Sequence, residues 1–306
     1  MADFRGMLLP VPTVFLADGS VDDALMRELV DYYVDSGVDS LFITGSFGQG
    51  PAMSADERKH VAELIISQTA KRIPVAIHVG TADPYTTIEL GRHAMDAGAD
   101  ALGLVGPYYY SDRTPDEIRA HFRMVASALS APILLYNNPK YSGYPMGPEL
   151  MGQIVDDAPN IFGAKLAMGS IDEALNYREV LGDEFSLFAL ASSLYPGMLV
   201  GITGTVSPPL AVFPELGVEL VRAIDDQDSA RALEVQKVVI QFHSAFLSHR
   251  VRKECGRAIY GAALQELGFP VKMYPRWPTG EVTDQRRAWL KDLYRNARNV
   301  LARKAA

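Results

Sequence analysis

Lys165 is the residue with the clearest potential for chemistry, because it lies in an apolar segment that predicts a buried strand. The segment reads Ile-Phe-Gly-Ala-Lys-Leu over residues 161–166. Taking an unpaired ammonium out of water is costly, so burial lowers the pKa of a lysine and favours its neutral form. A neutral amine is a nucleophile for a carbonyl carbon. The alternative is a solvated lysine just beyond the strand, and the rest of the chain decides between the two.

Other reactive side chains follow further apolar segments. The glycine-rich loop 45–50 contains Ser46, and its hydroxyl and backbone N–H groups at the start of a helix suit a carboxylate. Tyr136 ends another segment, where its phenol either relays protons or bonds to the backbone at a rim. His78 ends a third segment and is expected to be a structural histidine with satisfied nitrogens. The tyrosines at 108–110 suit a core or an interface as well as a site.

These residues are separated by alternating strand and helix patterns. The expected strands lie within 7–14 and at 40–44, 74–79, 101–105, 133–136, 161–166, 185–190 and 204–206. The expected helices cover 22–36, 54–69, 83–97, 147–157, 170–181, 194–200 and 213–225, with a further one starting at Thr114, Pro115 and Glu117. Capping boxes are predicted at Ser54 with Glu57 and at Ser170 with Glu173.

Eight strand–helix units predict a TIM (β/α)8 barrel over residues 1–226, in the α/β class. Lys165 would then lie at the carboxyl ends of the strands, where barrel enzymes place their active sites. An open doubly wound sheet is the alternative, but it would need a glycine fingerprint at the first turn, and Pro12-Thr13 offers none. Residues 227–306 are expected to form a C-terminal appendage of three helices packed on the barrel.

Composition excludes several classes of protein. The 306 residues carry a formal net charge of −8, which argues against a nucleic-acid surface or a basic membrane patch. Cys255 is the single cysteine, so no internal disulfide is possible, and no cluster of His, Asp or Glu suggests a metal site. The chain shows neither a signal peptide nor an apolar run long enough to span a bilayer. We therefore expect a cytoplasmic protein without nucleic-acid, membrane or metal partners.

Five motifs, in this order and at these spacings, resemble one known family. They are Gly45-Ser46-Phe47-Gly48, Gly106-Pro107-Tyr108-Tyr109, Tyr136-Asn137-Asn138-Pro139, Gly163-Ala164-Lys165 and Gly204-Thr205-Val206-Ser207. The chain is similar over nearly its whole length to the dihydrodipicolinate synthase / N-acetylneuraminate lyase superfamily, the class I pyruvate-dependent aldolases. Members are commonly tetramers built as dimers of dimers, so the resemblance implies a homotetramer.

The resemblance also implies a role for each matching residue. Lys165 would form a Schiff base with pyruvate or a 2-keto acid, without any other cofactor. Tyr136 would be the acid/base, and Ser46 would link it to Tyr109 of a neighbouring subunit. The amides of Ser46 and Phe47 would hold the substrate carboxylate. The Val206 carbonyl would lie near the Schiff base.

Departures from the family pattern narrow the substrate. Tyr141 stands where dihydrodipicolinate synthases have an arginine for a second carboxylate, which argues against aspartate semialdehyde. Residues 191–193, Ala-Ser-Ser, replace the acidic pair that sialic acid lyases place after the seventh strand. The segments 48–54 and 143–144 look closer to 2-keto-3-deoxygluconate-type aldolases.

The first hypothesis is therefore reversible aldol cleavage of a 2-keto-3-deoxy sugar acid to pyruvate and an aldehyde. Two catalytic alternatives stay open. One is condensation of pyruvate with an aldehyde, as in the synthases. The other is a hydratase-aldolase in which Phe47 and Tyr141 shape a pocket for an aromatic substrate. Outside catalysis, the alternative is a barrel that binds a keto acid without turnover.

Overall fold

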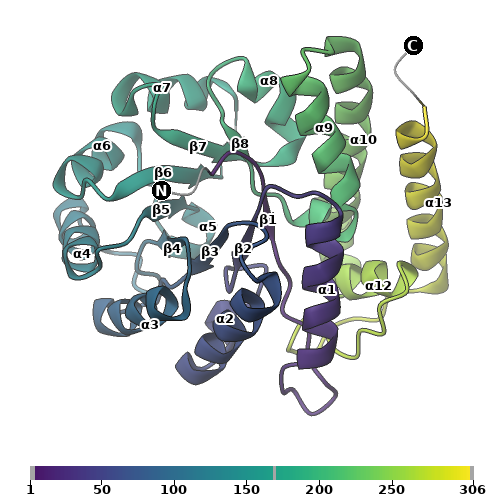
Figure 1. Cartoon of the computed structure of the whole chain (residues 1–306), viewed down its shortest axis with the longest axis horizontal. Helices are drawn as coiled ribbons and strands as arrows, with labels where there is room; N and C mark the ends of the chain where they lie inside the picture. The colour runs from purple at the N-terminus through teal and green to yellow at the C-terminus, as the bar shows by residue number, and fades with distance from the viewer. Residues whose placement is uncertain (1–3, 168–169, 304–306) are drawn as a thin grey trace.

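The computed structural model describes residues 4–167 and 170–303. Within these residues, eight parallel strands close into a barrel in sequence order (Figure 1). The strands are β1 (Gly6–Pro10), β2 (Ser40–Ile43), β3 (Val75–His78), β4 (Ala101–Val105), β5 (Ile133–Asn137), β6 (Ile161–Leu166), β7 (Ser186–Ala189) and β8 (Gly204–Thr205).

The barrel closes between its first and last strands, where Gly6 pairs with Gly204 and Met7 with Thr205. Gly204 allows this approach, because a Cβ there would lie 2.3 Å from the carbonyl oxygen of Gly6. The predicted (β/α)8 barrel is confirmed. The alternative of an open doubly wound sheet is wrong, since that sheet would leave its two edge strands unpaired.

Helices connect the strands and surround the barrel. The longer ones are α1 (Asp23–Asp35), α2 (Ala55–Thr69), α3 (Pro84–Ala97), α4 (Pro115–Ala128), α6 (Pro148–Asp157), α7 (Asp172–Leu181) and α9 (Pro214–Asp225). Shorter turns of helix are η1 (Gly50–Ala52), α5 (Pro139–Ser142), η2 (Ala191–Ser193), α8 (Leu194–Met198) and η3 (Pro208–Val212).

Of the three helix starts predicted from a Ser or Thr followed three residues later by a glutamate, two are confirmed and one is wrong. Ser54 and Thr114 form capping boxes with the glutamates three residues later. The capping box predicted at Ser170 does not form: α7 begins at Asp172, and its N-cap residue Ile171 makes no side-chain cap hydrogen bond. Two acidic residues in the first turn of α7 stabilise this start through the helix dipole instead.

The hydrophobic core has two layers. One lies inside the barrel, where alternate strand residues point inward, and consists of Phe4, Leu8, Phe42, Ala76, Ala101, Leu134, Phe188 and Val206. A larger layer joins the barrel to its surrounding helices. Side chains of this inner layer therefore fill the barrel below the carboxyl ends of its strands.

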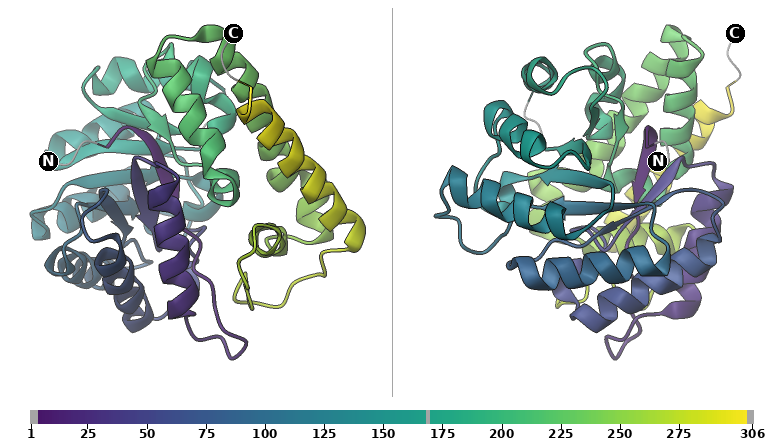
Figure 2. Two further views of the ribbon diagram at one scale, coloured as in Figure 1. Left: turned by 45° about the vertical axis from the view of Figure 1, so that its right-hand side comes forward. Right: turned by 60° about the vertical axis from the view of Figure 1, so that its left-hand side comes forward.

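The C-terminal region contains one more helix than predicted. Over described residues 227–303 there are four helices, α10 (Ser229–Leu247), α11 (His249–Glu254), α12 (Ala258–Glu266) and α13 (Asp284–Leu301). The short, polar α11 has no apolar repeat from which the sequence could predict it. Figure 2 shows α13 alongside α10, which itself packs on α9 of the barrel. The boundary at residue 226 stays a prediction.

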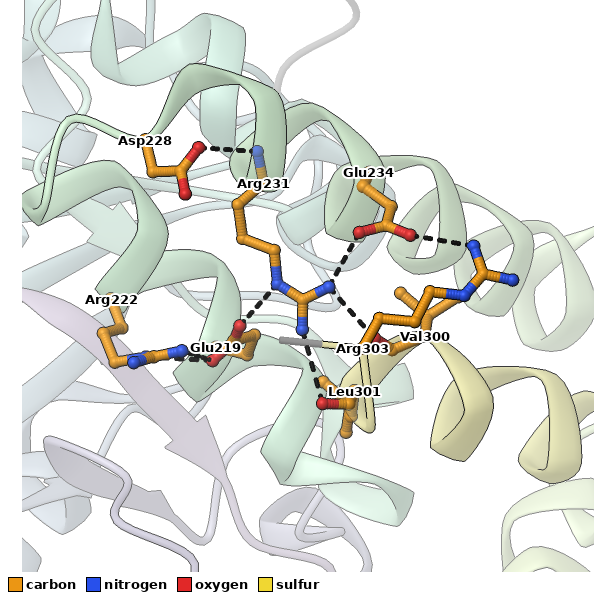
Figure 3. A network of polar contacts seen from close by, with 8 residues as sticks. All are labelled: Glu219, Arg222, Asp228, Arg231, Glu234, Val300, Leu301 and Arg303. Carbon is orange, nitrogen blue, oxygen red and sulfur yellow. Dashed lines mark hydrogen bonds and ion pairs between the residues drawn. The ribbon is translucent and has the colours of Figure 1, made fainter. Parts of the chain in front are cut away.

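Arg231 links the C-terminal end of α13 to α9 and α10 (Figure 3). Its side chain, 6% exposed, forms ion pairs of 2.6 Å with Glu219 and 2.7 Å with Glu234. It also donates to the carbonyl of Val300 at 2.9 Å. One guanidinium thus joins α9, α10 and α13. Because it is buried, its charge is stabilised by these partners and not by water.

We expect Arg231→Met to lower the free energy of unfolding by about 3 kcal/mol, measured by urea denaturation, because it leaves buried acceptors without their donor. This loss of stability lies near the lower end of the usual range for a broken buried ion pair. The reason is that Glu219 retains its ion pair with Arg222 and Glu234 retains its ion pair with Arg303. The matched control is Arg303→Met, an exposed arginine, which should cost less than about 1 kcal/mol. Equal losses in the two variants would contradict the assignment.

Candidate active site

The register between β5 and β6 places Lys165 beside Tyr136. These two residues are direct partners across the parallel strand pair. Residues at the same level of adjacent strands, with the same orientation in the pleat, project to the same side of the sheet. The Lys165 Nζ lies 4.2 Å from the centre of the Tyr136 ring. The strand pairing alone therefore brings an amine and a phenol together at the carboxyl ends of the barrel strands.

Lys165 is buried, with 8% of its surface exposed. Its Nζ also lies 5.4 Å from the ring centre of Phe42, so aromatic faces surround much of the amine. Burial lowers the pKa of Lys165 to about 7. A shift of about three units corresponds to roughly 4 kcal/mol in favour of the neutral amine. The alternative of a solvated lysine is wrong, and near neutral pH a large fraction of this amine is uncharged.

Tyr136 is also buried, and its hydroxyl accepts a hydrogen bond of 2.8 Å from the side-chain amide of Asn138. Burial raises the pKa of Tyr136, while the side chains of Ser46 and Asn138 oppose that shift. The phenol therefore stays protonated at neutral pH, and Ser46 lies within reach of it. A protonated phenol next to a neutral amine can donate, accept and pass on a proton.

Close packing and hydrogen bonds from several parts of the chain hold the backbone of the glycine-rich loop 45–50 in place. Gly50 is required, since a Cβ there would lie 1.9 Å from the carbonyl oxygen of Thr44. Gln49 adopts a left-handed conformation and donates to the carbonyl of Thr13 at 3.0 Å. The side-chain oxygen of Gln49 accepts the backbone N–H of Arg276 at 2.7 Å. Gln49 therefore holds the loop, and its amide group is engaged by the backbone.

The C-terminal region fixes the two peptide groups that follow Ser46 and Phe47. Arg257 donates to the carbonyl of Ser46 at 2.5 Å, and the hydroxyl of Tyr274 donates to the carbonyl of Phe47 at 3.0 Å. Because the peptide group is planar, fixing the carbonyl also fixes the amide on its other side. The ring of Phe47 packs between Tyr260 and Tyr274.

A cavity of about 500 Å³ opens above Lys165 and Tyr136. This volume suits a small-molecule ligand. Among the described residues, its lining is Ser46, Phe47, Tyr136, Asn138, Pro139, Lys140, Tyr141, Lys165, Leu166, Ala167, Leu190, Pro208, Phe246, Leu247, Arg252, Gly256, Arg257 and Tyr260. The cavity thus brings together five of the seven predicted site residues.

The remaining two predicted residues lie elsewhere. Val206 is fully buried in the inner layer of the barrel, and the role of its carbonyl stays a prediction. Tyr109 is 83% exposed, with a positive φ of 81°, and its ring contacts Tyr110 at 5.1 Å. Tyr109 is therefore free to meet another molecule, and its role in the site stays a prediction.

His78 is not the satisfied histidine that the sequence predicts. It is buried, and neither ring nitrogen has a hydrogen-bond partner among the residues that the structure describes. Burial, followed by the charges of Arg58 and Lys165, lowers the pKa of His78 well below its usual value. Its ring is neutral and packs edge-on against Phe42 and Tyr136.

Arg252 and Arg257 are cavity residues that the motifs did not reveal. Residues 249–257 include four basic side chains in a chain of net negative charge. This basic cluster is the feature of the sequence that could have indicated an anion-binding segment. Sequence alone does not place that stretch near Lys165, because it lies more than eighty positions further along the chain.

Residues 4–167 and 170–303 contain neither a cluster of metal-ligating side chains nor a helix that could span a membrane. No group of three or more His, Cys, Asp or Glu side chains gathers there as metal ligands would. Likewise, no helix in those ranges combines the length and the apolar character that crossing a membrane requires.

A closed parallel barrel with a buried amine at the carboxyl ends of its strands defines a class of (β/α)8 protein with a buried-lysine site. The chain belongs to the dihydrodipicolinate synthetase family, whose sequence profile matches residues 3–297. This match confirms the resemblance seen in the five motifs.

Two relatives and one solved structure illustrate the range of the family. YagE of Escherichia coli K12, provisionally named a 2-dehydro-3-deoxy-D-gluconate aldolase, is 30% identical over 298 residues, which cover 95% of this chain and 96% of YagE. A 4-hydroxy-tetrahydrodipicolinate synthase of Agrobacterium fabrum is 37% identical over 243 residues, covering 79% and 82%. The crystal structure of E. coli YagE in complex with pyruvate has a TM-score of 0.89 at 29% identity, covering 97% of this chain and 99% of that chain.

The pH dependence of Lys165 modification should follow a pKa of about 7. Since only the neutral amine attacks a carbonyl, trapping of pyruvate with cyanoborohydride should rise about tenfold between pH 6 and pH 8 and then level off. Mass spectrometry of the peptide that contains Lys165 measures the adduct. Continued steep growth above pH 8 would indicate an ordinary, solvated lysine.

Proposed function

We propose that this protein is a class I aldolase that reversibly cleaves a 2-keto-3-deoxy sugar acid to pyruvate and an aldehyde. The observation that carries the proposal is the buried amine of Lys165, with a pKa near 7, next to the Tyr136 phenol. The family supports it, as do the name of YagE and the pyruvate bound to YagE. The Schiff base needs no separate cofactor, and a cytoplasmic location remains part of the proposal.

In this reaction Lys165 Nζ adds to the C2 keto carbon of the substrate, and the keto oxygen leaves as water with one proton from the amine and one from solvent, so that the nitrogen keeps one proton as an iminium. Tyr136 then accepts the proton of the C4 hydroxyl while its own phenolic proton passes to Ser46. The C3–C4 bond breaks, its electron pair enters the iminium to form an enamine, and the aldehyde leaves. The enamine takes up a proton at C3, and water hydrolyses the imine to release pyruvate and the free amine.

The glycine-rich loop orients the substrate in the proposed reaction. The amides of Ser46 and Phe47 bind the C1 carboxylate. The Ser46 carbonyl, which accepts from Arg257, orients the Phe47 amide, and the Gly45 carbonyl, which accepts the Gly50 N–H at 3.1 Å, orients the Ser46 amide. Backbone donors that are already oriented lose little entropy on binding, which favours one pose of the reacting carbon. The Val206 carbonyl completes the surroundings of the Schiff base.

The cavity lining favours this reaction over condensation with aspartate semialdehyde. That substrate carries an ammonium group, which needs a carboxylate partner once it leaves water. No aspartate or glutamate is among the described residues that line the cavity. The hydratase-aldolase alternative has its own support, because Phe47, Tyr141, Phe246 and Tyr260 give the cavity an aromatic side. Substrates of both kinds therefore belong in the turnover assay.

A panel of 2-keto-3-deoxy acids should release pyruvate with the wild-type protein, measured by a coupled lactate dehydrogenase assay. Lys165→Ala should abolish both the release and the trapped adduct. Tyr136→Phe should lower kcat by about a hundredfold to ten-thousandfold, the usual contribution of acid/base catalysis, while pyruvate trapping on Lys165 remains. Release from aromatic substrates alone would favour the hydratase-aldolase, and an adduct without turnover of any substrate would favour a keto-acid-binding protein.

We further propose a homotetramer in which Tyr109 completes the site of a neighbouring copy. Support comes from the exposure of the Tyr109 ring, since large apolar side chains exposed together mark contact surfaces. Tyr110 beside it is 60% exposed. The proton accepted by Ser46 then passes to Tyr109 of the neighbour.

Co-expression of Tyr109→Phe with Lys165→Ala should restore activity that neither variant has alone. A mixed pair contains one site with Lys165 from one copy and Tyr109 from the other. Sedimentation velocity should give a tetramer for both variants. If mixed assemblies form but stay inactive, Tyr109 does not act across an interface.

A further inference from the structure

The charge of the cavity is opposite to that of the whole protein. The chain carries a formal net charge of −8. Yet Lys140, Arg252 and Arg257 line the cavity together with Lys165, and no acidic side chain is among its described lining residues. Cations gathered in a concave site with aromatic walls attract anions and repel cations. One carboxylate, that of the pyruvate half, accounts for only part of this charge.

Arg257 is the cation with the most defined position. Its side chain is partly buried, donates to the carbonyl of Ser46 at 2.5 Å and donates to the hydroxyl of Tyr141 at 2.9 Å. The guanidinium also lies 5.7 Å from the ring of Trp277. These two hydrogen bonds leave part of its five-donor fork for a ligand.

No carboxylate of the described residues forms an ion pair with Arg257. Elsewhere in the chain, the buried Arg231 pairs with two glutamates. Withdrawing a guanidinium from water without a counter-charge is costly, so such a position is stabilised when an anion binds there. The neutral partners of Arg257 orient the group without cancelling its charge.

Arg257 joins the two loops that enclose the reacting atoms. Ser46 belongs to the loop after β2, and Tyr141 belongs to α5 after β5, a few residues beyond Tyr136. The Arg257 charge acts on Tyr136, where it opposes part of the rise that burial causes in the pKa of the phenol. The hydroxyl of Tyr141 thus accepts from an arginine that lies 116 positions further along the chain.

We propose that Arg257, with Arg252 and Lys140 at the mouth of the cavity, binds an anionic group at the far end of the aldehyde half of the substrate. This inference rests on the proposed function and specifies its substrate class: a 2-keto-3-deoxy acid with a second anionic group. A carboxylate and a phosphate share the required chemistry, since both accept paired hydrogen bonds from a guanidinium.

Three substrates with the same keto end separate these cases. They are 2-keto-3-deoxygluconate, 2-keto-3-deoxyglucarate and 2-keto-3-deoxy-6-phosphogluconate, whose far ends are neutral, carboxylate and phosphate. We expect kcat/KM to be at least about tenfold higher for one of the two anionic substrates than for the neutral one. Arg257→Gln should reduce that preference about tenfold to a hundredfold, the effect of losing hydrogen bonds to a charged group.

Lys253→Gln is the matched control, because Lys253 is an exposed cation of α11 that does not line the cavity. It should leave the preference unchanged. Pyruvate trapping on Lys165 in Arg257→Gln measures how far losing the hydrogen bond to the Ser46 carbonyl disturbs the loop, and the change in preference is judged beyond that common loss. If Arg257→Gln instead weakens all three substrates and pyruvate equally, Arg257 serves the keto end or the loop, and the proposal is overturned. A neutral substrate preferred by the wild type overturns it as well.

A binding measurement keeps the inference testable without turnover. D-glucarate and D-gluconate lack the keto group, so neither forms a Schiff base, and they differ in one terminal carboxylate. Titration calorimetry should show tighter binding of D-glucarate to the wild type and no difference with Arg257→Gln. Equal binding to the wild type would contradict the anion site, whereas a lack of Lys165 adduct and of pyruvate release would contradict the aldolase proposal alone.

Discussion

The exclusion of water from the amine of Lys165 is the physical constraint on which the site depends. A lysine on the outside of a barrel would be protonated at neutral pH and unable to attack a carbonyl carbon. Here Phe42 and Tyr136 surround the amine, and burial lowers the pKa of Lys165 to about 7. The pairing of Tyr136 with Lys165 between β5 and β6 places a phenol beside the amine. A rigid closed sheet can hold both groups in place, which a surface loop would not.

The C-terminal region is a functional part of the site. It packs on the barrel through α10, and Arg231 fastens its last helix. From this base, Arg257 and Tyr274 hold the carbonyls of Ser46 and Phe47 and thereby orient the loop. The same region supplies Arg252 and Arg257, two of the cations that line the cavity. Barrel stability, loop geometry and substrate charge are therefore coupled through one group of helices.

Much of the fold and part of the site could be predicted, and the errors have physical causes. Strand and helix periodicity are local signals, so the barrel and most of its elements follow from the pattern. The capping box at Ser170 failed because two acidic residues offer another start for α7. The short α11 has no apolar repeat to reveal it. The burial of His78 without a hydrogen-bond partner depends on neighbours from other strands, which no local pattern describes.

The sequence by itself determined the alternation of strands and helices, the family and the placement of Lys165 and Tyr136 at strand ends, because each is encoded in short stretches of chain. Only the tertiary structure decided the state of the amine and the charge of the cavity. A pKa depends on every group that displaces water around the amine, and here those groups come from several strands. Arg257 meets Ser46 across 211 positions of the chain, a contact that exists only once the barrel and the C-terminal helices have packed together.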